Sequence, residues 1–316
     1  MFLLNKTHRK FEYILFAFCF ITIFNGCNNN KETNPYEITN NNSSTRSNKA
    51  NVLEIKSPGT DTIGNSHVTI DYTNASEGYL VVTYLGESNR SKLQVTGTNG
   101  ITYTYDLIIN EQNTIPLTSE SGHYDLTLFE GVGPNQYSVL FAGALDVTID
   151  NAYSPYLYPN QYVNFNKDSK AVSLAEQLAE GATCDLEVVS RIYKYVVENI
   201  SYDHEEAENV EPGYLPDVDE VIETKKGICF DYASLMTAML RSQSIPTKLQ
   251  IGYAMDAYHA WISVYTADQG WIDGVIEFDG AKWTLMDPTF ASNSKSKSKL
   301  KDFIGTGSNY VTKYTY

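Results

Sequence analysis

The sequence has 316 residues and carries 38 Asp and Glu against 23 Lys and Arg, which gives a formal net charge of −15 at pH 7. So acidic a surface argues against a protein that binds nucleic acid and against one that adheres directly to anionic lipid. The aromatic residues are mostly tyrosines, 24 in all, and they suit a folded protein with amphipathic surfaces.

The segment 1–26 is typical of a secretory signal. Lys6, Arg9 and Lys10 supply a basic start, and the apolar run YILFAFCFITIF follows at 13–24. This run is shorter than the roughly 20 residues that a transmembrane helix needs. The sequence FNGC at 24–27 resembles the lipobox of bacterial lipoproteins. That resemblance implies removal of 1–26, lipidation of Cys27 as the mature N-terminus, and a lipid anchor that holds the protein to the membrane outside the cytoplasm. The alternative is an ordinary secreted signal or an uncleaved signal segment.

Residues 27–51 are rich in Asn and Ser and nearly free of large apolar side chains. Such a segment cannot bury enough surface to offset the entropy that ordering costs, so we expect a flexible tether. Roughly 265 residues then remain, which is enough for two folded domains. We expect these domains at 52–150 and 151–316, because the hydrophobic period changes between them.

Residues 52–150 are predicted to form an antiparallel, β-sandwich-like domain, because apolar and polar residues alternate in short runs rich in β-branched and aromatic side chains. The runs are 78–86, 92–96, 101–107, 123–129 and 136–149. TNG at 98–100 separates two of them and predicts a hairpin. His67 and His123 stand apart from any cysteine or carboxylate cluster in the sequence, so both are expected on the surface or in turns. The domain is therefore predicted to be a binding module, a spacer or a platform.

From about residue 168 the apolar residues repeat at helical spacing, which predicts a run of helices. They are expected within 168–182, 184–200, 218–227 and 225–248, with an acidic loop at 201–217. Asp168 is the expected cap of the first helix and Gly181 its stop. Pro246 is expected to end the last one.

Cys229 lies in the first turn of the last predicted helix, beside unpaired backbone amides and the positive end of the helix dipole. This position favours a reactive thiolate. If Cys19 leaves with the signal and Cys27 is lipidated, the folded part keeps Cys184 and Cys229. A Cys184–Cys229 disulfide and a small buried side chain are therefore the alternatives to a nucleophile.

Two later residues supply what a nucleophilic thiol needs. His259 begins the second strand of a predicted hairpin at 248–265, and Asp287 ends a strand-like run at 282–290. An imidazole can take the thiol proton, and a carboxylate can fix the imidazole tautomer and stabilise its cation. Taken singly, His259 could equally be a strand residue satisfied in the core, and Asp287 before Pro288 could be a turn residue.

Three motifs in this order, GICFDYASLMTAMLRSQSIPTKLQIGY, YHAWISVY and WTLMDPTF, resemble the transglutaminase-like superfamily of cysteine enzymes with a papain-like core. The resemblance covers about residues 168–291. It implies an α+β fold in which a helix-borne cysteine packs on an antiparallel sheet, with Cys229 as the nucleophile, His259 as the base and Asp287 as the orienting acid. It also makes Tyr202, within NISYDHE, a candidate for the oxyanion side of the site, with packing as the alternative role.

Active members of this superfamily share an acyl-thioenzyme and differ in whether water or an amine resolves it. For a protein tethered in the bacterial envelope we expect hydrolysis of an amide or peptide bond in a protein or peptide outside the cell. Protein-glutamine crosslinking is one alternative, and a non-catalytic scaffold that binds a surface partner is another. Cys, His, Asp and Glu do not occur at metal-ligand spacing and no glycine-rich phosphate loop is present, so neither a metal nor a cofactor is expected.

The C-terminal segment 291–316 changes from basic and Ser-rich to Tyr-rich. The basic part could dock on the acidic protein itself. FIGTGSNYVTKYTY at 303–316 is compatible with an edge strand or with a loose tail.

Overall fold

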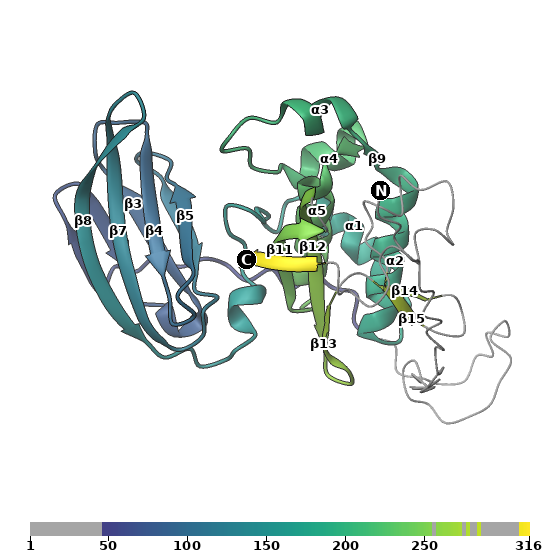
Figure 1. The fold of residues 1–316 in the computed structure, drawn as a ribbon. Helices are drawn as coiled ribbons and strands as arrows, with labels where there is room; N and C mark the ends of the chain where they lie inside the picture. Colours follow the sequence, from purple (N-terminus) through teal and green to yellow (C-terminus); the bar gives the residue numbers. More distant parts are fainter. Residues whose placement is uncertain (1–45, 255–256, 274–275, 279–282, 286–309) are drawn as a thin grey trace, which may run out of the picture.

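The structure is a computed structural model, and it describes residues 46–254, 257–273, 276–278, 283–285 and 310–316. In Figure 1 the described parts form a β-sandwich on one side and an α+β part on the other. The C-terminal strand β16 (Tyr310–Thr315) lies between them. The predicted mixed fold with antiparallel sheets is thereby confirmed.

The described part of the sandwich consists of two antiparallel sheets, with strand orders β1–β2–β3–β6 and β5–β4–β7–β8. The first contains β1 (Thr62–Asn65), β2 (Val68–Asp71), β3 (Tyr79–Tyr84) and β6 (Gln112–Pro116). The second contains β4 (Ser91–Thr96), β5 (Thr102–Asp106), β7 (Gly122–Gly133) and β8 (Gln136–Val147). Side chains alternate between the two faces of a strand, and Leu93 of β4 and Leu126 of β7 are fully buried in the core. This alternation is why the sequence forms stacked sheets here.

The alternating runs correctly predict β3, β4, β5, β7 and β8. The hairpin at TNG is also confirmed, because β4 and β5 pair antiparallel on either side of it. Gly100 has φ +71° and the side chain of Asn99 accepts the N–H of Ile101 at 2.9 Å, as a tight turn requires. Strands β1, β2 and β6 are not among the predicted runs, because they are short and contain polar or turn residues that hide the alternation.

His123 differs from its prediction. It is exposed on β7, as expected, but its Nδ1 lies 2.8 Å from Oδ1 of Asp146 and its Nε2 lies 3.5 Å from Oδ1 of Asp125. The expectation that it stands apart from carboxylates is therefore wrong, because strand pairing places Asp146 of β8 directly opposite His123. These contacts raise the pKa of His123, chiefly through the hydrogen bond with Asp146.

The described helices are α1 (Lys170–Ala179), α2 (Asp185–Asn199), α3 (His204–Asn209), α4 (Val218–Thr224) and α5 (Cys229–Ser242). Short 3-10 turns, η1 (Ala75–Glu77) and η2 (Ser154–Tyr156), lie within and after the sandwich. Helix α3 interrupts what the sequence predicts to be an acidic loop. It forms there because Oδ1 of Asp203 accepts the N–H of Glu206 at 3.1 Å and caps its first turn.

Two predicted helix ends are wrong in detail. Asp168 does not cap α1. Instead the carboxylate of Asp219, at the start of α4, accepts the N–H groups of Lys170 and Ala171, each at 3.0 Å. Helix α5 ends at Ser242, before Pro246 is reached, because the chain turns through Ser244 at φ +59°. Gly181 follows α1 at φ +71°, which agrees with its role as a stop.

A further antiparallel sheet, separate from the two of the sandwich, supports α5. Its described order is β13–β12–β11–β16, with β11 (Thr247–Ala254), β12 (Ala257–Thr266) and β13 (Gly270–Asp273). The predicted hairpin of β11 and β12 is confirmed, and β16 pairs with β11 as an edge strand. Two shorter pairs are also described, namely β9 (Ser201–Tyr202) with β10 (Lys226–Gly227), and β14 (Ile276–Phe278) with β15 (Trp283–Leu285).

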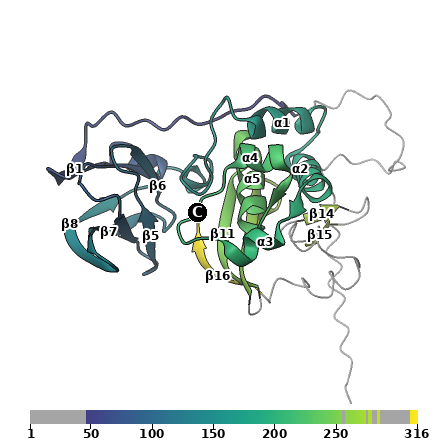
Figure 2. The same ribbon diagram turned by 90° about the horizontal axis from the view of Figure 1, so that it is seen from above.

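Helix α5 is the central element of the α+β part. Figure 2 shows it between the β11–β12 sheet and helices α1 and α2. All its residues from Asp231 to Ser242 are buried, which is the pattern of a core helix. The guanidinium of Arg241 is also buried, and it donates to the carbonyls of Thr247 and Tyr158. Burial decreases only at the N-terminal end of the helix, where Cys229 is half-buried.

Tyrosines join the sandwich to the α+β part. The ring of Tyr316 lies 5.5 Å from Tyr103 and 6.1 Å from Tyr105, both on β5. Tyr162, which follows the sandwich, lies 4.3 Å from Tyr316 between ring centroids. The hydroxyl of Thr118 donates to the carbonyl of Thr315 at 2.8 Å. Strand β16 and Tyr316 therefore hold the second sheet of the sandwich against the sheet that supports α5.

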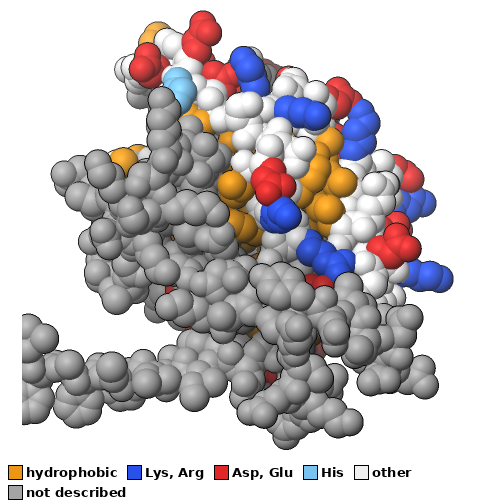
Figure 3. Space-filling view, turned by 90° about the vertical axis from the view of Figure 1, so that its right-hand side faces the viewer, with side chains coloured by type: hydrophobic (Ala, Val, Ile, Leu, Met, Phe, Trp, Pro, Cys, Tyr) orange, Lys and Arg blue, Asp and Glu red, His pale blue; other side chains and the backbone are white. Residues whose placement is uncertain are grey.

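The outer helical surface looks like an ordinary solvated face. In Figure 3, basic and acidic side chains alternate over the described part of this side, with small hydrophobic patches between them. Along α2, which lies on that side in Figure 1, Glu187 pairs with Arg191 and Lys194 with Glu198. Exposed pairs of this kind contribute about 0.3–0.5 kcal/mol each. None of the helices in the described ranges combines the length and the hydrophobicity that crossing a membrane requires.

Candidate active site

Cys229 is the first residue of α5, at the positive end of the helix dipole. Its side chain is half-buried, and among the described residues it is a free thiol. The alternative of a Cys184–Cys229 disulfide is therefore wrong. A half-buried thiol at the first turn of a core helix is rigidly placed and still open to a reactant.

The glycine that precedes Ile228 and Cys229 is required by packing. A Cβ atom on Gly227 would lie 2.6 Å from Cβ of Asp231 and 3.0 Å from its Oδ2. That oxygen accepts the N–H of Ile228 at 2.7 Å and so closes the first turn of α5. Any larger residue at position 227 would displace Asp231, and with it the turn that carries Cys229.

Tyr202 lies beside this turn. Strands β9 and β10 pair in parallel, with Tyr202 opposite Gly227. The N–H of Asp203 donates to the carbonyl of Gly227 at 3.0 Å and fixes the pairing. The half-buried ring of Tyr202 also packs on His204, at 5.0 Å between centroids. Tyr202 thus has a packing role in addition to its place at the site.

His259 lies near the start of β12 and only 5 % of it is exposed. Its ring is stacked on Trp261 at 6.1 Å and lies 6.3 Å from Tyr310 of β16. Across the sheet it faces Gly252 of β11. The imidazole is therefore held among aromatic rings from two strands, which leaves it little freedom to turn away.

One cavity of about 520 Å³ is lined by Cys229, His259 and Tyr202 together. Its wall comes from three parts of the fold, namely Thr104 and Asp106 of β5, Val210 to Leu215 after α3, and Tyr314 and Tyr316 at the C-terminal strand. Tyr258 also lines it. Burial raises the pKa of Tyr258, and the charges of neighbouring groups, Cys229 among them, add to the effect. The cavity can therefore admit a substrate to a thiol and an imidazole from the side of the sandwich.

The third predicted residue, Asp287, lies outside the described residues. Strand β15 (Trp283–Leu285), which precedes it, pairs with β14. The role of Asp287 as the orienting acid therefore stays a prediction.

Two residues of this site were not predicted from the sequence. Asp231 is 1 % exposed, and its Oδ1 accepts the hydroxyl of Tyr214 at 2.7 Å while its Oδ2 accepts the N–H of Ile228. An acid at the third position after a helix N-cap is a recognisable capping signal, so Asp231 could have been found. Tyr214 could not, because it comes from the loop before α4 and meets Asp231 only in the folded chain.

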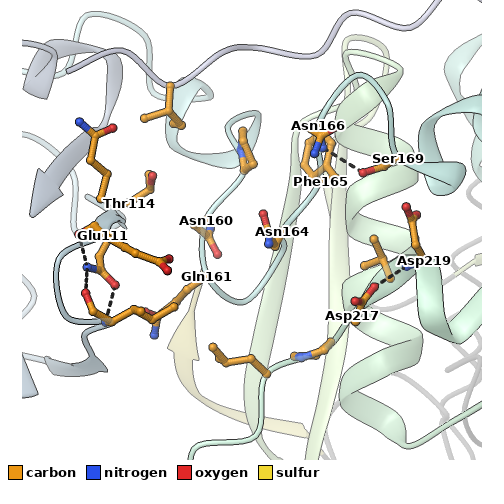
Figure 4. Close-up of a pocket in the computed structure, with 18 residues that line it drawn as sticks. Glu111, Thr114, Asn160, Gln161, Asn164, Phe165, Asn166, Ser169, Asp217 and Asp219 are labelled. Atoms are coloured by element: carbon orange, nitrogen blue, oxygen red, sulfur yellow. Dashed lines mark hydrogen bonds between the residues drawn. The ribbon is translucent and has the colours of Figure 1, made fainter. Parts of the chain in front are cut away.

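A second cavity of about 540 Å³ lies next to the first, and Gln161 and Leu215 line both. Figure 4 shows Glu111 and Thr114 from the sandwich on one side of it and Asp217 and Asp219 on the other. Both aspartates are occupied by backbone groups, since Asp217 accepts the N–H groups of Asp219 and Glu220 and Asp219 caps α1. Cys229 and His259 do not line this cavity, so the candidate catalytic residues lie at the first one.

Within the ranges that the structure describes, His, Cys, Asp and Glu side chains do not gather in a group of three or more that could hold a metal ion. The candidate site is built from a thiol, an imidazole and tyrosines.

Residues 172–274 match the family model of the transglutaminase-like superfamily. This range contains both Cys229 and His259, on the helix and the strand just described. The segment is a transglutaminase-like core. The family that the three motifs resemble is thereby confirmed for this part of the chain, and the sandwich precedes the matched core.

The chain is similar to parts of two curated proteins. It is 32 % identical over 88 residues to UPF0252 protein MJ1282 of Methanocaldococcus jannaschii, which is 24 % of this chain and 25 % of that protein. It is 27 % identical over 101 residues to the uncharacterized protein YebA of Bacillus subtilis, 26 % of this chain and 13 % of that protein. The match thus spans a quarter or less of the length of these relatives.

Among solved structures, the ethylmercury-bound periplasmic domain of TgpA from Pseudomonas aeruginosa is similar. The TM-score is 0.34 with 15 % sequence identity, over 76 % of this chain and 78 % of that one. The assignment of residues 172–274 to the superfamily rests on the match to its family model. The candidate site is described from the geometry of this chain alone.

Proposed function

We propose that this protein is a cysteine hydrolase of amide or peptide bonds. Cys229 and His259 meet at one cavity of the transglutaminase-like core, and this observation carries the proposal. In the first step His259 takes the thiol proton, and the sulfur of Cys229 attacks the substrate carbonyl. The amine leaves with a proton returned by the imidazolium, and an acyl-thioenzyme remains. Water, deprotonated by His259, then attacks the thioester, and the thiolate is released.

The surrounding residues support these roles. Asp287 is proposed to orient His259 and to stabilise its cation. Tyr202 is proposed to face the oxyanion, since its segment is fixed at Gly227, close before the nucleophile in the chain. Cys229 lies at the N-terminus of α5, at the positive end of the helix dipole.

The shape of the cavity supports a protein or peptide substrate. Its wall combines the core with Thr104 and Asp106 of the sandwich, so a chain can contact both parts. The lining is rich in aromatic rings, which bind the apolar faces of peptides. Asp106 and Glu211 also line it, and for this reason peptides with lysine or arginine belong in any substrate panel.

We expect purified protein to release ammonia or amine from such a panel of peptides and glutamine substrates without an added primary amine. Water is abundant at a cavity that opens to solvent and can resolve the thioester. The measurement is product release followed by mass spectrometry, with and without the amine. Product that forms only when the amine is present would contradict hydrolysis and assign a crosslinking transferase. A panel on which the protein and its Cys229→Ala variant are indistinguishable would assign a non-catalytic scaffold.

We further propose that the chain acts outside the cytoplasm, tethered through a lipid on Cys27. The basic residues, short apolar run and FNGC at its start support this. Cys27→Ser is expected to leave the membrane fraction or to accumulate unprocessed in a bacterial host, as seen by fractionation and by labelling with a fatty acid. Cys19→Ser, within the apolar run, is the control and should behave as wild type. Unchanged processing and membrane retention of Cys27→Ser would point to a plain signal anchor.

A further inference from the structure

Residues 210–215, which we term the cavity loop, form part of the wall above Cys229. The segment that leads into the loop is weakly held, since residues 204–213 are all exposed or half-buried. Helix α3 buries no residue. Segments with few buried contacts open more readily than the core does.

Tyr214 ties the cavity loop to the core. Its hydroxyl donates to Oδ1 of Asp231 at 2.7 Å, and its ring lies 6.4 Å from Phe230. The other oxygen of Asp231 accepts the N–H of Ile228. One buried carboxylate therefore holds both the cavity loop and the turn that places the nucleophile.

We propose that Asp231 is a positioning residue that fastens the cavity loop through Tyr214 while it holds the turn of Cys229, so that closure of the cavity and placement of the nucleophile depend on the same carboxylate. The inference rests on the proposed function for its catalytic consequence. The coupling of loop and turn can be measured without catalysis.

The charges around Asp231 make this fastening sensitive to pH. Burial raises the pKa of Asp231 to about 6, although its hydrogen bonds with Ile228 and Tyr214 oppose the shift. The negative charges of Glu206 of α3 and Glu220 of α4 raise the pKa of Asp231 further. The pKa of Tyr214 is raised above its usual value, first by burial and then by Asp231, so the hydroxyl stays a donor. Above about pH 6 the bond is charge-assisted. Because the closed protein raises the pKa of Asp231, however, protonation favours the closed state, and closure weakens as the pH rises through about 6.

The test is hydrogen exchange of the peptide that spans 204–216 in the full mature chain, with intrinsic rates corrected for pH. Tyr214→Phe keeps the ring contact with Phe230 and removes the bond, and it should raise exchange in the loop about tenfold at pH 7.5. Asp231→Asn should raise it at least as much, because it also disturbs the bond from Ile228, and adding Tyr214→Phe to Asp231→Asn should have no further effect on the loop. In wild type the exchange should therefore rise as the pH increases from 5 to 7.5, whereas in Asp231→Asn it should stay flat.

The control is Tyr79→Phe, which removes a buried hydroxyl bonded to Lys56 in the sandwich. It should leave the cavity loop unchanged. Exchange in Tyr214→Phe equal to that of wild type, or additive effects in the double variant, would overturn the proposal. Tyr214→Phe decides the matter even if Asp231→Asn does not fold.

The same measurement in a Cys229→Ala background separates this inference from the proposed function. If Tyr214→Phe raises hydrogen exchange of the cavity loop in the inactive Cys229→Ala protein, this supports the role of Asp231 and Tyr214 in holding the loop, whether or not the protein is an enzyme. In the active chain, Tyr214→Phe should lower kcat/KM about threefold to tenfold and should change the rate at which iodoacetamide labels Cys229. An unchanged labelling rate with loosened loop exchange would contradict the link between loop and nucleophile.

Discussion

Replacing Cys229 by alanine is expected to reduce amide hydrolysis by about four orders of magnitude or more, to background. In the proposed mechanism the thiolate forms the covalent bond to the substrate, and no acyl-enzyme exists without it. In enzymes with a nucleophile and a base, removal of the nucleophile alone costs about as much as removal of the whole set. The measurement is the single-turnover rate on the best substrate of the panel.

The fold should survive this change. Cys229 is half-buried at the end of α5, so alanine removes one sulfur atom beside an open cavity. We expect a loss of about 1 kcal/mol or less in the free energy of unfolding, since larger losses come from filled core positions. Circular dichroism and thermal unfolding check this. Ser173→Ala, an exposed change on α1, is the matched control and should keep full activity.

Labelling supplies an independent readout of the same prediction. Iodoacetamide should add one group to Cys229 in wild type, located by mass spectrometry, and substrate should protect it. Full activity in Cys229→Ala, or alkylation of Cys229 without loss of activity, would exclude the thiol as the nucleophile. The proposed function would then fail.

Local patterns predicted much of the fold because local forces form it. Strand β4 alternates buried and half-buried residues, and TNG supplies the turn to β5. In helix α5 the residues Leu235, Met236, Met239 and Leu240 repeat at helical spacing, so its existence and its start near Cys229 were visible in the sequence. Cys229, His259 and Tyr202 were then found lining one cavity, although no local pattern relates a helix to a strand that comes later in the chain.

What the sequence could not show depends on contacts between distant segments. Asp219 caps α1 from the start of another helix, so the nearer Asp168 was the wrong choice. Tyr214 meets Asp231 only when the cavity loop closes over α5. The tyrosines of β5 contact Tyr316 because the sandwich packs on β16, and no spacing in the chain predicts that. These contacts are nevertheless what shapes the cavity.

Replacing His259 by glutamine is expected to lower kcat/KM by about three orders of magnitude. General acid–base catalysis by a positioned side chain contributes roughly 10²–10⁴-fold, and the imidazole serves in both halves of the reaction. Glutamine is close to histidine in volume, which matters because His259 is buried between Trp261 and Tyr310. An alanine there would leave a hole in the sheet and confuse a catalytic loss with a structural one.

The mechanism of the loss can be read from the reactivity of Cys229. Without the imidazole to take its proton, the thiol should be labelled by iodoacetamide only as the pH approaches that of a free cysteine, which titrates near about 8.5. Wild type should be labelled faster at neutral pH, because the imidazole takes the thiol proton. The control is His123→Gln, because His123 is an exposed histidine with carboxylate neighbours on the sandwich, away from the cavity. It should leave both kcat/KM and the labelling profile unchanged.

A His259→Gln protein that keeps wild-type kcat/KM, or one in which Cys229 is labelled with the same dependence on pH, would show that another group deprotonates the thiol. The pairing of Cys229 with His259 would then have to be abandoned, even though both line the same cavity.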